Sequence, residues 1–143
     1  MSTFKLQDLK QLVYNLLKND TTLIGLLDDH ESIYHFYPKQ EDKVPYPILV
    51  YSILGIQDNQ YDSDIDTGIN KLTLNIDIFS DNSSTKEVDD IADRVYELLH
   101  AKSISDDNIL AYTCYRVYQD ESFEDNSQTW RINARYEITN TRN

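Results

Sequence analysis

The stretch "VPYPILVYSILG", residues 44–55, constrains the fold more than any other part of the chain. Pro45 and Pro47 have no backbone N–H to donate to a neighbouring strand, so they mark the start of a strand and not its middle. The residues that follow, Ile48 to Tyr51, are apolar or aromatic at every position. Both faces of this strand therefore need cover, as in a sheet that is buried on two sides.

Periodicity predicts helices and strands along the rest of the chain. Apolar residues recur at helical spacing over residues 6–17 and 88–99. Strict alternation of apolar and polar residues over 71–79 and 129–138 predicts two strands, each with one buried face. Residues 109–119 have the composition of a strand, although their two faces are not cleanly divided. The shorter segments are a helix over 21–29, a strand over 32–38, a hairpin-like loop over 56–70 and an acidic loop over 120–128.

Two of the predicted helices begin with capping signals. Asp20 or Thr21 can accept a hydrogen bond from the first turn of the short helix. Ser84 and Glu87 have the spacing of a capping box, in which each side chain bonds the backbone N–H of the other residue. The resulting order of elements predicts a single α+β domain over residues 1–143. We expect a mostly antiparallel or mixed sheet of about five strands, with two to three helices packed on one face.

The face of the sheet that the helices leave open is the candidate functional surface. It combines charged residues such as Lys71, Asp77 and Glu137 with the second apolar side of residues 48–54. A surface of mixed charge and exposed apolar groups is typical of a protein interface. We therefore expect another subunit to supply the missing cover. The candidate interface residues are Ile48, Leu49, Val50, Tyr51, Arg131 and Arg135.

The charge balance argues against nucleic-acid binding. The chain has 25 acidic and 13 basic residues and a net charge of −12, and such a surface repels phosphate backbones. Two explanations fit this charge. It can serve solubility alone, or it can form a surface that nucleic acid passes without binding. No apolar run approaches the roughly 20 residues of a transmembrane helix, and the first residues do not have the pattern of a secretion signal. We expect a cytosolic product with no membrane partner.

The residue spacings predict neither an enzyme nor a cofactor. Asp62, Asp64 and Asp66 resemble the start of a calcium loop. The register then fails, because the sixth position lacks the required glycine and the twelfth lacks the bidentate glutamate. Cys114 is the single cysteine and stands in a tyrosine-rich segment, which favours a small buried hydrophobe over a nucleophile. The histidines, which have no zinc-ligand spacing, are His30, His35 and His100.

Six stretches in a fixed order carry a resemblance to a known family. They are "LQDLKQLVYNLL", "IGLLDD", "PYPILVY", "LTLNIDIFS", "STKEVDDIADRVYELLH" and "WRINARYEI". In this order the chain resembles the small tail-completion or tail-terminator proteins of long, non-contractile-tailed phages, also described as tail-to-head joining proteins. The similarity spans nearly the whole chain and is one of hydrophobic pattern, without a catalytic signature. Its strongest parts are the proline-led strand and the strand–serine–helix unit of residues 72–99.

This resemblance implies a structural virion protein that forms a hexameric ring on the head-proximal end of the tail tube. There it would stop tube growth and offer a docking surface to the DNA-filled head, after assembly in the host cytoplasm. The implied partners are further copies of the chain, the tail tube protein and a head-completion or connector protein, with DNA passing through unbound. The alternatives are another head–tail connector component, such as a head-closure or adaptor protein, or a calcium-dependent binding module. The candidate lumen or partner loops carry Asp62, Asp64, Asp66, Glu121, Glu124 and Asp125.

Overall fold

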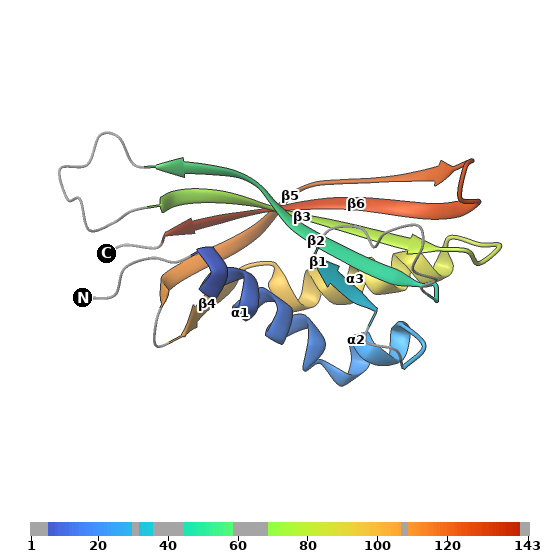
Figure 1. The fold of residues 1–143 in the computed structure, drawn as a ribbon, viewed down its shortest axis with the longest axis horizontal. Coiled ribbons are helices and arrows are strands. Elements are labelled where there is room, and N and C mark those ends of the chain that lie inside the picture. The colour runs from blue at the N-terminus through green and yellow to red at the C-terminus, as the bar shows by residue number, and fades with distance from the viewer. Residues whose placement is uncertain (1–5, 30–31, 36–44, 59–68, 107–108, 141–143) are drawn as a thin grey trace.

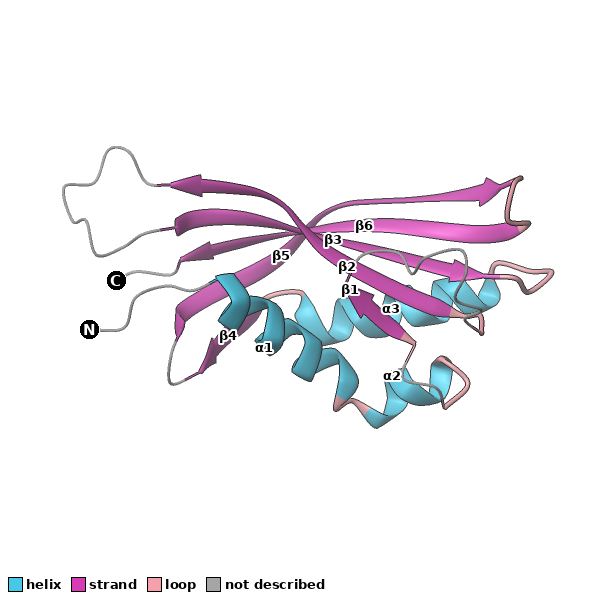
Figure 2. Ribbon diagram, viewed as in Figure 1, coloured by secondary structure: helices cyan, strands magenta, loops and turns pink. Residues whose placement is uncertain are grey.

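A computed structural model describes residues 6–29, 32–35, 45–58, 69–106 and 109–140. Within these ranges the chain forms two layers, with three helices side by side on one face of a twisted six-stranded sheet (Figure 1, Figure 2). The elements are α1 (Leu6–Lys18), α2 (Thr21–Leu26), β1 (Ile33–His35), β2 (Ile48–Asp58), β3 (Ile69–Ser80), α3 (Lys86–Leu99), β4 (Lys102–Asp106), β5 (Ile109–Glu124) and β6 (Thr129–Asn140).

The strands lie in the order β1-β2-β3-β6-β5-β4. The short β1 runs parallel to β2, and every other neighbouring pair is antiparallel. The predicted α+β class, the mixed sheet and the placement of the helices on one face are confirmed. The sheet has one strand more than expected, because β4 is short and polar in sequence and pairs with the first part of β5.

The hydrophobic core lies between the sheet and the helices. Alternate residues of β3 and β6 point into it, as their sequence pattern predicts, and α3 presents its apolar stripe to the same layer. Full burial of one valine, leucine or isoleucine side chain contributes about 1.5–3 kcal/mol to the free energy of folding. The residues of these three elements in the core are Leu72, Leu74, Ile76, Ile78, Ile132, Ala134, Tyr136, Ile138, Val88, Ile91, Ala92, Val95 and Leu99.

Asp20 begins α2 and also joins it to α3. Its carboxylate accepts a hydrogen bond of 2.8 Å from the backbone N–H of Leu23, which confirms Asp20 as the capping residue. Arg94 of α3 donates to both carboxylate oxygens, from Nε over 2.9 Å and from Nη2 over 2.7 Å. This hydrogen bonding by Arg94 lowers the pKa of Asp20 below its usual value. One carboxylate therefore caps a helix and links two helices that are distant in sequence.

The capping box predicted at the start of α3 does not form. The residue before the helix is Thr85, and its side chain makes no capping hydrogen bond. Glu87 instead accepts a hydrogen bond from the hydroxyl of Ser80, at the end of β3. The backbone N–H of Lys86 donates to the hydroxyl of Ser84 over 3.4 Å. The prediction was wrong because the side chain of Glu87 bonds to Ser80 at the end of β3 and is therefore not available to cap the helix.

The segment predicted as an acidic loop is mostly strand. β5 continues through Glu124, and the turn that follows covers residues 125–128. Its pairing with β6 shifts register between Arg116 and Tyr118, which is a β-bulge at Val117. Before the bulge the even-numbered residues face the helices, and after it the odd-numbered ones do. This shift explains why the sequence of β5 does not divide cleanly into two faces.

The first residues of β2, which follow Pro45 and Pro47, are buried within one chain. Ile48 and Leu49 are 0% exposed, and Val50 and Tyr51 are each 6% exposed. Leu49 and Tyr51 lie in the core under the helices, whereas Ile48 and Val50 pair with residues of β3 that point to the other face. These four residues therefore do not need a second subunit to cover them, and their place in a subunit contact stays a prediction.

We predict that Asp20→Ala lowers the free energy of unfolding by about 2 kcal/mol, because it removes a helix cap and leaves Arg94 without its bidentate partner. Chemical denaturation would measure the change. Lys86→Ala is the matched control, since it breaks the exposed Lys86–Asp90 pair of 2.7 Å and should cost less than about 0.5 kcal/mol. Equal losses in the two variants would contradict the prediction.

Candidate docking surface of the sheet

The sheet face opposite the helices, called here the open sheet face, is built by alternate residues of β3, β6 and the second half of β5. In the register of β3 and β6, Asp77 lies opposite Asn133, and Asn75 lies opposite Arg135. Lys71 pairs with Glu137 across the strands over 3.1 Å. The predicted mixed-charge face is therefore present, and its charges come in pairs of opposite sign.

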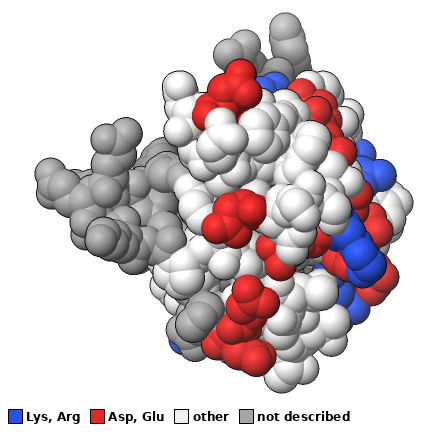
Figure 3. All heavy atoms as spheres, turned by 90° about the vertical axis from the view of Figure 1, so that its right-hand side faces the viewer, with Lys and Arg blue, Asp and Glu red and all other residues white. Residues whose placement is uncertain are grey.

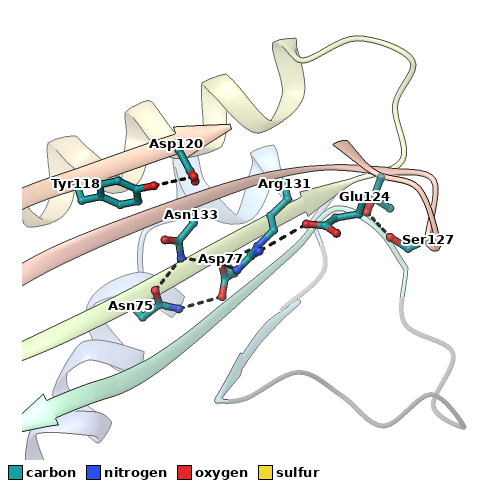
Figure 4. Close-up of polar contacts among 9 residues, drawn as sticks. Asn75, Asp77, Tyr118, Asp120, Glu124, Ser127, Arg131 and Asn133 are labelled. Atoms are coloured by element: carbon teal, nitrogen blue, oxygen red, sulfur yellow. Dashed lines mark hydrogen bonds and ion pairs between the residues drawn. The ribbon is translucent and has the colours of Figure 1, made fainter. Parts of the chain in front are cut away.

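Asp77 is the centre of a polar cluster on this face (Figure 4). Its Oδ1 accepts hydrogen bonds from Arg131, over 3.0 Å from Nε and 2.8 Å from Nη2. The same oxygen accepts a bond of 2.9 Å from Asn133 Nδ2, and Oδ2 accepts one of 2.9 Å from Asn75 Nδ2. One carboxylate on β3 thus holds three neighbouring side chains in place.

Two asparagines complete the cluster by bonding to each other. Asn133 Nδ2 donates to Asn75 Oδ1 over 2.7 Å, and each residue is 7% exposed. A buried amide without a partner is costly, so this pair fixes the alignment of β3 with β6. The two residues are far apart in the sequence, and no local pattern indicates that they meet.

Arginine and tyrosine side chains extend the cluster toward β5. Arg131 Nη1 lies 3.5 Å from Glu124 Oε1, a second and more exposed carboxylate. Arg135 lies over the ring of Tyr118, 5.3 Å from its centroid, and the Tyr118 hydroxyl donates to Asp120 over 2.7 Å. Both arginines of the predicted interface are therefore on the open sheet face, engaged within the chain.

The remaining predicted residues do not form one group. Glu124 lies on the open sheet face, and Asp125 lies in the turn between β5 and β6. Glu121 is on the opposite side, where it contacts Asp89 of α3. Asp62, Asp64 and Asp66 lie outside the described residues. The prediction of a lumen or partner contact for these acidic residues stays a prediction.

Glu121 and Asp89 form a pair of carboxyl groups that share a hydrogen bond. This bond, followed by burial and the negative charge of Asp89, raises the pKa of Glu121 to about 7. Glu121 is therefore partly protonated near neutral pH, which allows the two acidic groups to lie together.

Acidic residues dominate the end of the molecule where β5 turns into β6 and β3 leads to α3. Seen end-on in Figure 3, this end shows several separate acidic patches, with basic residues gathered along one side. A surface of this kind repels phosphate groups and does not attract them.

The described residues give little support for metal or thiol chemistry. Among them, no group of three or more His, Cys, Asp or Glu residues could hold a metal ion. Cys114 is fully buried, and burial raises the pKa of its thiol to about 12. The thiol is therefore protonated at neutral pH and does not act as a nucleophile. No helix in the described part of the chain is long and apolar enough to cross a membrane.

Sequence reasoning missed the exposed apolar residues of β5. Tyr115, Val117, Tyr118 and Phe123 are each more than 40% exposed. Large apolar side chains in this position are typical of contact surfaces. The eleven tyrosines of the chain were a signal of a contact surface. They predict neither the bulge at Val117 nor the length of β5, and these two features determine which side chains are exposed.

A two-layer α+β domain with an open sheet face and exposed apolar residues on β5 has surfaces suited to contact with other proteins. Residues 11–140 match the family described as tail completion protein gp17, and the chain belongs to that family. The family consists of structural proteins of phage tails and is not a class of enzymes. The chain is thus a virion-associated protein of the head–tail joining type.

Two solved structures share this fold. The gp17 protein of bacteriophage SPP1 is 18% identical, with a TM-score of 0.63 over 100% of this chain and 97% of that chain. A chain from the virion of a native gene transfer agent particle is 15% identical, with a TM-score of 0.64 over 89% of this chain and 90% of that chain. The comparison with curated proteins found no match.

We predict that Asp77→Ala lowers the free energy of unfolding by about 2–3 kcal/mol, because it leaves the amide of Asn75 and the guanidinium of Arg131 without this acceptor and removes one of the two acceptors of Asn133. Glu124→Ala is the control, since it removes only the longer and more exposed contact of Arg131 and should cost less than about 1 kcal/mol. Urea denaturation of both variants would check this. A similar loss in the two would show that Asp77 is not the centre of the cluster.

We also predict that Glu121 makes stability depend on pH. Its pKa is raised in the folded chain, so the folded state binds the proton more tightly than the unfolded state, where the pKa is about 4.3. Its contribution to stability is therefore complete below that value and is lost as pH rises through about 7. Glu121→Gln should flatten the stability profile between pH 5 and 8.

Thermal unfolding across this pH range would measure the effect, with Asp125→Asn as a control that removes a carboxylate from the exposed turn. If Glu121→Gln and the unmodified chain have parallel profiles, the shared proton is not present.

Proposed function

We propose that the chain forms a homo-oligomeric ring, a hexamer, that caps the head-proximal end of a phage tail tube. The observation that carries this proposal is the match to the tail completion family across residues 11–140. In this role the ring stops tube polymerisation and provides the surface on which the DNA-filled head docks. Its partners are further copies of itself, the tail tube protein and a head-completion or connector protein.

Physical features of the chain support this proposal. The open sheet face presents alternating charges that can find partners on another protein. The net charge of −12 suits a channel that DNA crosses without being held, because carboxylates repel phosphates at short range in physiological salt. In this proposal Asp62, Asp64 and Asp66 face the lumen or a partner, together with the acidic end of the β5–β6 hairpin.

We predict that removal of this protein from the phage that encodes it yields tails of irregular, excessive length and heads without tails. The physical reason is that an uncapped tube continues to add subunits and has no surface for the head connector. Electron microscopy of lysates would measure tail length and head attachment, and the intact chain supplied in trans should restore both. Tails of normal length joined to heads in its absence would overturn the proposal.

A further inference from the structure

Among the described residues, two strands of the sheet have a free edge over part of their length. β4 pairs with β5 only as far as Cys114, and the Arg116 N–H donates to His100 Nδ1 over 3.0 Å. On that side of β5, no described strand pairs with residues 118–124. In the same way β1 covers β2 only at residues 49–51, and no described strand pairs with residues 52–58 on that side. A free edge carries unpaired backbone N–H and C=O groups that can pair with another strand.

Exposed apolar side chains gather on the same two strands. Leu54 on β2 is 53% exposed, and Val117 and Phe123 on β5 are 57% and 42% exposed. Leu16 of α1 is the one large exposed hydrophobic residue among the described residues that lies on neither strand. Apolar side chains beside a free edge are typical of strands that pair on assembly.

The directions and lengths of the two free stretches match. Because each neighbouring pair from β2 through β3 and β6 to β5 is antiparallel, β2 and β5 run in opposite directions. The free stretch of β5 can therefore extend the free stretch of β2 in a second copy as an antiparallel pair. Residues 118–124 and 52–58 have equal length, so the segments covered by β4 and β1 do not collide.

In this antiparallel pair, side chains that lie opposite each other also point to the same face of the sheet. Glu124 and Ser52 lie on the open sheet face, because they pair with Thr129 and Asn75 in the alternation of β6 and β3. Phe123 and Ile53 both point to the helix side, where Phe123 contacts Trp130 at 5.1 Å and Ile53 packs on the core. The register shift between Ile53 and Gly55 places Leu54 outside the regular pairing. Alignment of Glu124 with Ser52 thus also brings Phe123 opposite Ile53.

Charge selects this pairing over a symmetric one. A β5–β5 pair would place Asp120, Glu121 and Glu124 against the same residues of another copy, and like charges opposite each other are destabilising. The free stretch of β2 carries one ionisable residue, Asp58, at its end. The acidic edge of β5 therefore meets an almost uncharged strand in a second copy.

We propose that copies of this chain join through the β5 edge of one copy and the β2 edge of the next, with Glu124 opposite Ser52. This inference rests on the proposed ring and names the contact that closes it. The two edges lie on opposite sides of one sheet, so the contact is head-to-tail, and such a contact closes into a ring when the rotation permits. The sheet then continues from one subunit to the next around the ring.

Disulfide cross-linking tests the contact and its register. Within one chain, positions 52 and 124 are separated by β3 and β6, about 14 Å at the usual strand spacing, which exceeds the reach of a disulfide. We expect oxidised Ser52→Cys/Glu124→Cys protein to form covalent multimers up to a closed ring on non-reducing gels. Copper phenanthroline would be applied both to the purified chain and to tails assembled in the complemented phage.

Controls separate the possible contacts. Ser52→Cys/Asp120→Cys places both thiols on the open sheet face but out of register, and it should form few covalent multimers. An equal mixture of the two single variants, Ser52→Cys and Glu124→Cys, should stop at covalent dimers. The unmodified chain should not cross-link, because its cysteine is buried.

The outcomes distinguish this contact from the proposed function. Dimers of Glu124→Cys alone would show a symmetric β5–β5 contact and overturn the inference. Rings or capped tails that form without any cross-link would overturn the inference and leave the proposed function standing. Normal, head-bearing tails in the absence of the protein would overturn the proposed function, whatever the cross-linking result.

Discussion

The structure depends on the burial of one apolar row that crosses β3 and β6. The row alternates strictly along each strand, and α3 covers it with an apolar stripe of its own. Because the row faces one way, the helices collect on that side, as Figure 1 shows. The opposite side of the sheet is left without a helical layer among the described residues. Its polar groups must then be satisfied by the sheet itself or by another molecule.

The cluster around Asp77 meets that requirement. A buried polar cluster of this kind adds little net stability, since each bond replaces one with water. Its value lies in the cost of misalignment, because a shift of β3 against β6 by one residue would separate Asn133 and Arg131 of β6 from their acceptors on β3. The apolar row determines which face is buried, and the cluster determines the register. These two strands are thereby held in a single alignment.

The sequence was sufficient for the parts of the fold that repeat with a regular period. Residues 71–79, 88–99 and 129–138 lie in the elements that their patterns predict. The end of β5 could not be predicted, because its acidic residues disfavour a strand and pairing with β6 overrides that preference. The candidate surface was predicted in part. Arg131 and Arg135 lie on it, but the contacts of Asn75 with Asn133 depend on strand pairing that local sequence does not encode.

The bulge at Val117 has a consequence for how the chain tolerates change. The strand is two half-strands of opposite phase, and one inserted residue joins them. Deletion of that residue would restore regular alternation from Arg116 to Tyr118, so Phe123 would stay against Trp130 and Asp120 would stay on the open sheet face. The bulge therefore absorbs a change of one residue in the length of the strand without changing which side chains face the helices. Substitutions along this half-strand act one side chain at a time, whereas a slip of its pairing with β6 by one residue would reverse the whole surface.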